Sequence, residues 1–239
     1  MSTDYFVMTR EEETGICDTD NNHFICFNNT ALSYILPRNL ISCYVADGLF
    51  ESGMIDWCKQ FCKKDKLMLD IGAHTGTYGI SLGNLCKKVY CFEPQRMTYY
   101  ALCGSVALSN LRNVVCLNYG LGSNDQVGKN TLHIVSDDGG GSTLHKNNMT
   151  VLREEEIEIR TLDSLELNDV GFIKMDVEDN ELYVLLGSEK TLQRCNYPKI
   201  FFECNNRIKN KELFDYFSRL GYQVISVRGA GNMYLAEKS

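Results

Sequence analysis

The 239-residue sequence contains only three prolines and one tryptophan, and no segment is rich in proline, serine or glutamine. Disordered linkers have a polar, low-complexity composition, so this sequence gives no sign of one. No apolar run approaches the roughly 20 residues that cross a bilayer, and we expect no membrane span. The polar segment Met1–Thr14 also lacks the apolar region of a secretion signal.

An excess of positive charge is also missing, because the formal net charge is −7. Nucleic-acid binding depends on clustered lysine and arginine side chains that contact phosphates. A nucleic-acid partner is therefore not favoured. The composition favours a neutral acceptor instead, such as a sugar or another hydroxyl compound.

The eleven cysteines contain no CxxC pair, and their spacing is irregular. They could form a metal or disulfide set, but metal sites usually show regular short spacings. The alternative is a reducing compartment, where free cysteine acts as a small buried hydrophobe. Together with the absent secretion signal, this alternative predicts a cytoplasmic location.

Short apolar runs alternate with segments of helical spacing through most of the chain. The predicted strands are residues 67–71, 89–92, 114–117, 170–176 and 200–203. The predicted helices are residues 51–63, 76–86, 97–109, 181–192 and 211–220. This alternation is typical of a parallel sheet with helices on both faces, so the sequence predicts an α/β fold.

Three segments depart from the alternation. Residues 1–45 predict a strand-rich extension, with a turn at 18–22 before a strand at 23–27, ahead of a main domain at 46–239. Residues 120–160 predict an inserted hairpin with a mobile glycine-rich loop at 137–142, followed by His145 as an alternative base. Residues 222–227 and 232–236 predict a C-terminal antiparallel hairpin.

A glycine-containing turn, residues 70–76, joins the first predicted strand of the main domain to the following helix. Its form is Asp-x-Gly-x-x-x-Gly, not the GxGxxG of a dinucleotide site, and it suits a ligand without pyrophosphate. Asp70 could hold a cationic amine or a water molecule. Alternatively, the segment is an ordinary turn in which Asp70 caps the helix.

Glu93 ends the next predicted strand, 17 to 23 residues past this turn. An acid at this place in a doubly wound fold accepts hydrogen bonds from the ribose hydroxyls of a nucleotide. The alternative is a solvated acid at a strand end.

Lys174, Asp176, Glu178 and Glu203 lie at the ends of the last two predicted parallel strands. If one strand continued through the first three, their side chains would share a face. Ligands of open α/β sheets bind outside the carboxyl ends of the strands. The alternatives are a structural ion pair at Lys174 and a surface acid at Glu203.

The order of these motifs resembles the FkbM family of methyltransferases over roughly residues 66 to 205. The matching segments are residues 69–76, 89–94, 161–165, 173–181 and 198–203. Asp179 stands where the family usually has glycine, and His74 stands where it usually has asparagine. The resemblance implies a Rossmann-like class I methyltransferase with a mostly parallel seven-stranded sheet. It also implies transfer of a methyl group from S-adenosyl-L-methionine to a hydroxyl oxygen.

The resemblance assigns roles to individual residues. Those expected to bind the cofactor are Asp70, Gly72, Ala73, His74, Gly76, Thr77, Glu93, Pro94, Asn118 and Asp176. Those expected to act in catalysis are Lys174, Asp176, Glu178 and Glu203. The place of Asp176 and Glu178 at the strand end, rather than the resemblance, makes one of them the expected general base. Lys174 would orient that acid or stabilise the developing alkoxide. In an alternative hypothesis the acids bind Mg²⁺.

A sugar or glycan hydroxyl is the predicted acceptor. The alternatives are a small natural product, a lipid or a non-catalytic S-adenosylmethionine-binding module. A nicotinamide or nucleotide-sugar enzyme would need the missing GxGxxG turn. The sequence does not indicate an oligomeric state.

Overall fold

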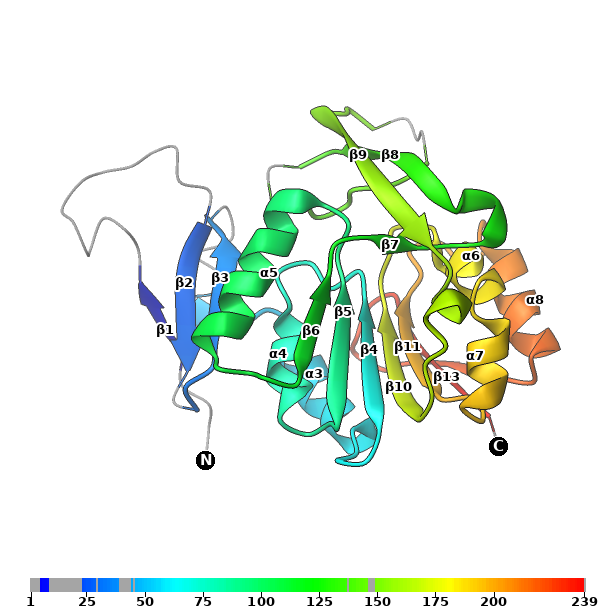
Figure 1. The fold of residues 1–239 in the computed structure, drawn as a ribbon, viewed down its shortest axis with the longest axis horizontal. Helices are drawn as coiled ribbons and strands as arrows, with labels where there is room; N and C mark the ends of the chain where they lie inside the picture. Colours follow the sequence, from blue (N-terminus) through cyan, green and yellow to red (C-terminus); the bar gives the residue numbers. More distant parts are fainter. Residues whose placement is uncertain are drawn as a thin grey trace.

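The computed structural model describes residues 5–8, 23–28, 30–38, 44, 46–136, 138–145 and 149–238. Its main sheet has seven strands in the order β12-β13-β11-β10-β4-β5-β6 (Figure 1). Five strands are parallel: β4 (Leu67–Ile71), β5 (Lys88–Phe92), β6 (Val114–Leu117), β10 (Val170–Met175) and β11 (Lys199–Glu203). The antiparallel pair β12 (Gln223–Ser226) and β13 (Met233–Glu237) completes the sheet, which confirms the predicted fold class and C-terminal hairpin.

Both faces of the main sheet are covered by helices, and the strands are buried on both sides. In β4, alternate residues belong to different cores: Met68 packs into one, and Leu69 with Ile71 packs into the other. The first core is covered by α3 (Ser52–Cys58), α4 (Thr77–Gly83) and α5 (Arg96–Leu108). The second core is covered by α6 (Glu181–Leu186), α7 (Glu189–Arg194) and α8 (Lys211–Arg219) (Figure 1). This two-sided burial explains why the strands are apolar runs rather than alternating ones.

Three predicted helices are shorter than expected, and the one predicted over residues 76–86 is α4, which ends at Gly83. The helix predicted over residues 51–63 ends as α3 at Cys58 and continues as a 3-10 turn, η2 (Lys59–Phe61). The helix predicted over residues 181–192 is broken between α6 and α7. At the break, a Cβ on Gly187 would lie 2.0 Å from the Gly122 carbonyl oxygen, and the side chain of Asp163 accepts from the Thr191 N–H at 2.7 Å. Close backbone approach and a new N-terminal cap therefore outweigh the continuous apolar pattern.

Strand β10 ends at Met175, one residue before the end of the predicted strand, so the strand does not continue through Glu178. The chain then turns, with φ angles of 53° at Glu178 and 73° at Asp179. This left-handed conformation explains the glycine that the FkbM family usually has at position 179. Aspartate is one of the few other residues that tolerates it, and here its Oδ1 also accepts from Asn210 Nδ2 at 3.3 Å.

Two small sheets flank the main sheet (Figure 1). The first comprises β1 (Tyr5–Met8), β2 (His23–Asn28) and β3 (Ser33–Pro37), and the turn predicted at 18–22 lies outside the described residues. The backbone N–H groups of Ser33 and Ile35 donate to the hydroxyls of Ser109 and Ser105, both at 2.8 Å, which fastens β3 to α5.

The second small sheet comprises β7 (Gly120–Leu121), β8 (Gly128–Ile134) and β9 (Arg153–Arg160). Strands β8 and β9 form the predicted inserted hairpin. The 3-10 turns η3 (Asn124–Gln126) and η4 (Leu162–Leu165) flank this sheet. Among the described residues, no helix combines the length and the apolar character that crossing a membrane requires.

Candidate active site

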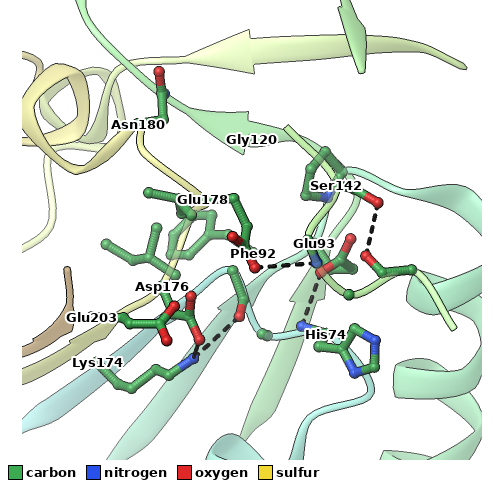
Figure 2. Close-up of a pocket in the computed structure, with 18 of the residues that line it drawn as sticks. His74, Phe92, Glu93, Gly120, Ser142, Lys174, Asp176, Glu178, Asn180 and Glu203 are labelled. Atoms are coloured by element: carbon green, nitrogen blue, oxygen red, sulfur yellow. Dashed lines mark hydrogen bonds and ion pairs between the residues drawn. The ribbon is translucent and has the colours of Figure 1, made fainter. Parts of the chain in front are cut away.

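A cavity of about 340 Å³ lies at the carboxyl ends of the parallel strands. The inserted sheet and the loop 138–144 contribute to its walls. Most of the predicted site residues line it: Gly72, Ala73, His74, Thr77, Glu93, Pro94, Lys174, Asp176, Glu178 and Glu203. In Figure 2, Glu93 and His74 lie on one side of the view, and Lys174, Asp176 and Glu203 lie on the other.

Gly72 brings the ends of β4 and β10 together under the cavity. Its φ is +74°, and a Cβ at this position would lie only 1.7 Å from the Asp176 carbonyl oxygen. The N–H groups of Gly72 and Ala73 both donate to the Phe92 carbonyl, at 3.1 and 2.9 Å. The glycine is therefore required by the contact between neighbouring strand ends, and that contact places Asp176 at the cavity wall.

The carboxyl group of Glu93 is buried and held by the backbone. Its Oε2 accepts from the His74 N–H at 2.8 Å, and its Oε1 accepts from the Gln95 N–H at 2.9 Å. Burial raises the pKa of Glu93 to about 7, although both N–H groups oppose the shift. Each carboxylate oxygen can accept a further hydrogen bond. The group is thus oriented to receive two neighbouring hydroxyls from the cavity.

His74 joins the glycine turn to the loop that covers the cavity. Its Nε2 lies 2.7 Å from the Asp138 carbonyl oxygen, and its Nδ1 lies 3.4 Å from Thr75 Oγ1. A carbonyl oxygen can only accept, so Nε2 carries the proton. Burial lowers the pKa of His74, which favours the neutral form of the ring. Its φ of 51° is a conformation that asparagine, the usual residue of the FkbM family here, also adopts readily.

Three predicted cofactor residues support the cavity without lining it. Asp70 Oδ2 accepts from the Gly79 N–H at 2.8 Å, and burial raises the pKa of Asp70 to about 6. Asn118 Nδ2 donates to the carbonyl oxygens of Glu93 and Pro94, at 3.0 and 3.1 Å. Gly76 has a φ of +89°, and a Cβ there would meet Leu102 of α5 at 2.4 Å.

Lys174 is buried beneath the cavity beside Asp176. Its Nζ lies 3.3 Å from Asp176 Oδ2, 3.4 Å from the Gly72 carbonyl oxygen and 5.2 Å from the centre of the Tyr78 ring. Burial alone would lower the pKa of Lys174, but the carboxylates of Asp176, Asp70 and Glu51 outweigh it and raise the pKa above its usual value. Lys174 is therefore a permanent positive charge that holds Asp176 in place.

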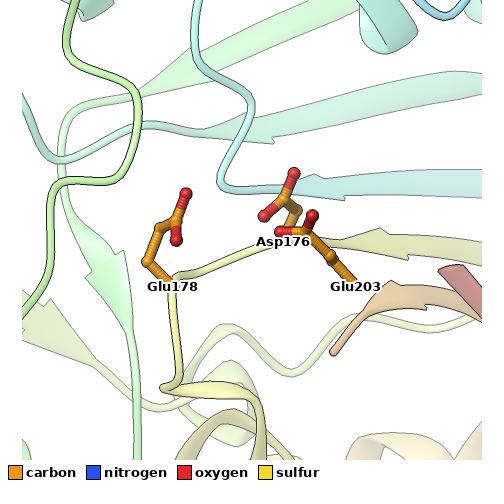
Figure 3. Close-up of side chains that lie close together, drawn as sticks. All are labelled: Asp176, Glu178 and Glu203. Atoms are coloured by element: carbon orange, nitrogen blue, oxygen red, sulfur yellow. The ribbon is translucent and has the colours of Figure 1, made fainter. Parts of the chain in front are cut away.

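Asp176, Glu178 and Glu203 form an acid cluster on this side of the cavity (Figure 3). One oxygen from each lies within 4.8 Å of one oxygen from each of the others. Burial, and then the charge of Asp176, raise the pKa of Glu178 to about 7 and that of Glu203 to about 8. Glu178 Oε1 also accepts from the Gly141 N–H at 3.1 Å, so the covering loop contacts the cluster. The turn after β10 therefore brings Glu178 beside Asp176 and Glu203, although no strand runs through all three acids.

The Methyltransferase FkbM domain matches residues 70–224, well over half of the 239 residues. The chain belongs to the FkbM methyltransferase family. No curated protein matches the sequence.

Two solved structures support the same fold. Methyltransferase FkbM from Methylobacillus flagellatus KT is 20% identical with a TM-score of 0.52, and the match covers 78% of this chain and 46% of that one. Precorrin-6y C5,15-methyltransferase from Geobacter metallireducens GS-15 is 13% identical with a TM-score of 0.51, and the match covers 80% of this chain and 90% of that one. The chain thus spans under half of the Methylobacillus protein.

Several cavity residues lie outside the FkbM motifs and were missed by the sequence analysis. They include Pro37, Tyr44, Phe50, Glu51 and Tyr78, all before or beside the glycine turn. The sequence placed Tyr78 in the helix after that turn, close to the expected site. No sequence pattern indicated that Phe50 or Glu51 would line the cavity. His145, the alternative base, is not among the residues that line the cavity, and its ring lies 5.7 Å from that of Tyr183.

Charge is distributed very unevenly around this cavity. Among the described lining residues, the carboxylates are Glu51, Glu93, Asp138, Asp176, Glu178 and Glu203, and Lys174 is the single lysine or arginine. When these carboxylates are ionised, the site attracts cations and repels phosphates, and the raised pKa values of Glu93, Glu178 and Glu203 make this effect stronger as the pH rises.

Proposed function

We propose that this FkbM methyltransferase uses S-adenosyl-L-methionine to methylate a hydroxyl group on a sugar or glycan. The observation that carries the proposal is a single cavity with two different ends. One end presents the backbone-held carboxylate of Glu93, and the other presents acids whose pKa values are raised toward neutrality. The first suits a ribose, and the second suits removal of a hydroxyl proton.

The residues present fit the proposed cofactor. Glu93 retains acceptor capacity for both ribose hydroxyls, because each of its oxygens accepts only one backbone N–H. The excess of carboxylates favours a sulfonium, whereas the pyrophosphate of a dinucleotide would be repelled. When bound, S-adenosylmethionine supplies an electrophilic methyl group.

The acid cluster would then activate the acceptor. An alcohol is a poor nucleophile until it loses its proton, and a positioned base contributes about 10²–10⁴-fold. Asp176 and Glu178 are the two candidates, and the contacts favour Glu178 because Asp176 is paired with Lys174. The acceptor oxygen would gain the methyl group as the methyl–sulfur bond breaks, which leaves S-adenosylhomocysteine, and it would lose its proton to the Glu178 carboxylate. Holding the acceptor in line with the methyl group would supply much of the remaining acceleration.

The same three acids could alternatively hold Mg²⁺, a hard cation that prefers oxygen ligands. A metal ion would lower the pKa of the acceptor hydroxyl directly. Unchanged methyl transfer after EDTA treatment and dialysis would exclude this mechanism. If transfer is lost and Mg²⁺ restores it, the metal ion rather than Glu178 would be the activating group.

Isothermal titration calorimetry with S-adenosylhomocysteine and, separately, NAD⁺ tests the cofactor assignment. We expect the first to bind and the second to give no heat. If NAD⁺ binds and S-adenosylhomocysteine does not, the proposal is overturned. Binding of S-adenosylhomocysteine without methyl transfer to any acceptor fraction would favour a non-catalytic binding module.

A further inference from the structure

Part of the cavity wall comes from residues that precede the FkbM match. Pro37 ends β3, and Tyr44, Phe50 and Glu51 follow it in the chain. The hydrogen bonds from Ser33 and Ile35 to α5 fix β3 against the main domain. The family match begins only at residue 70. This wall therefore lies outside the part of the chain that the family match covers.

Phe50 is an aromatic residue at the mouth of the cavity. It lines the cavity and is still 61% exposed. An exposed aromatic ring beside a polar cavity offers a flat apolar surface to a ligand. A pyranose ring is a suitable ligand, because it has one apolar face of C–H groups and an edge of hydroxyls.

Glu51 follows directly and supplies the polar counterpart. Its φ of 59° is unfavourable for glutamate, and such strain is often found at binding sites. Its Oε2 accepts from the Tyr78 hydroxyl at 3.0 Å, which holds the carboxylate at the wall. Burial and Glu51 itself raise the pKa of Tyr78, so that hydroxyl stays protonated. The side chain is half-buried, and its other oxygen has capacity to accept from a ligand hydroxyl.

The position of Glu51 indicates which end of the cavity it serves. Tyr78 lies under the ammonium of Lys174, at 5.2 Å from the ring centre, and Lys174 contacts Asp176 at 3.3 Å. Glu51 is thus connected to the acid cluster, where the acceptor would lose its proton. Glu93, by contrast, is bound to His74 and Gln95.

We infer that Phe50 and Glu51 form a subsite for a neutral sugar ring of the acceptor. Phe50 stacks on the apolar face of the ring, and Glu51 accepts a hydrogen bond from a ring hydroxyl. The surrounding carboxylates disfavour acidic sugars such as uronates. The inference rests on the proposed function for the reaction that follows, but sugar binding can be measured without it.

Saturation-transfer NMR with the methyl pyranosides of glucose, galactose and mannose tests the subsite, on the full chain with and without S-adenosylhomocysteine. We expect at least one sugar to show saturation concentrated on the protons of one ring face. The variant Phe50→Leu should lower the affinity for that sugar by roughly three- to tenfold, whereas Phe50→Trp should leave the affinity unchanged. The matched control is Tyr100→Leu, which removes another exposed aromatic ring, on α5 and away from the cavity lining.

The variant Glu51→Gln tests the polar half, because an amide oxygen can still accept from Tyr78. We expect it to lower the affinity for the sugar severalfold with little change in melting temperature. It should also narrow the difference in affinity between the neutral sugar and methyl glucuronide, which carries a carboxylate. Equal sugar affinity in Phe50→Leu and wild type, or no saturation with any of the three sugars, would overturn the inference. Failure of S-adenosylhomocysteine to bind would instead contradict the proposed function, since the sugar titration is also made on the cofactor-free protein.

Discussion

Replacing Glu93 by glutamine tests the ribose contact. The carboxylate accepts one backbone N–H at each oxygen, from His74 and from Gln95. In glutamine one of these oxygens becomes an NH₂ group, which faces a donor and must rotate away from it. The variant Glu93→Gln therefore loses both charge-assisted hydrogen bonds to ribose, each worth about 1.5–3 kcal/mol. The expected loss is at least roughly a hundredfold in affinity.

Calorimetry with S-adenosylhomocysteine measures this loss, and Glu155→Gln is the matched control. Glu155 also accepts a backbone N–H, from Arg96 at 2.9 Å, but does not line the cavity. The control should bind like the wild type. Because the pKa of Glu93 is raised to about 7, wild-type affinity should also weaken as the pH falls below 7. Folded Glu93→Gln protein that binds within about threefold of wild type would refute the ribose assignment.

Three further predictions concern catalysis, the glycine turn and pH. The variant Glu178→Gln should keep cofactor affinity within a few-fold and lose about 10²–10⁴-fold in methyl transfer, because it removes the proposed base; full activity would remove Glu178 from the mechanism. Gly72→Ala should unfold far more readily than Gly229→Ala in thermal melts, because both glycines have similar positive φ values but only Gly72 meets backbone atoms; equal melting temperatures would contradict this. Glu178 and Glu203 have raised pKa values of about 7 and 8, so the folded state holds protons that the unfolded chain releases. The free energy of unfolding of the cofactor-free protein should therefore fall as pH rises from about 4.5 to 8, and a higher melting temperature at pH 8 than at pH 5.5 would argue against these shifts.

The sequence predicted those parts of the site that depend on short-range pattern. The glycine turn at Gly72 and the acid Glu93 at the next strand end are close in sequence, and parallel strands bring their carboxyl ends together. Glu203 was placed correctly at the cavity for the same reason. The resemblance to the FkbM family added the mostly parallel sheet of seven strands, a number that local pattern does not contain.

The features that escaped prediction depend on contacts between distant segments. The break at Gly187 is set by close approach of the Gly122 carbonyl, which periodicity does not report. The contact between His74 and the Asp138 carbonyl joins the glycine turn to the loop between β8 and β9, 64 residues further along the chain. Glu51 reaches the cavity through an unusual backbone conformation and a hydrogen bond to Tyr78. Tertiary contacts of this kind override local preference.

Methyl transfer itself tests the central claim most directly. The protein is incubated with methyl-labelled S-adenosylmethionine and fractionated extract from the source organism, with Glu93→Gln in parallel. Label is then counted in the glycan, small-molecule, lipid, protein and nucleic-acid fractions, before and after alkali. We predict alkali-stable label in the glycan or small-molecule fraction of the wild type, greatly reduced in Glu93→Gln. Label mainly in protein or nucleic acid, or label that alkali removes, would contradict methylation of a sugar hydroxyl.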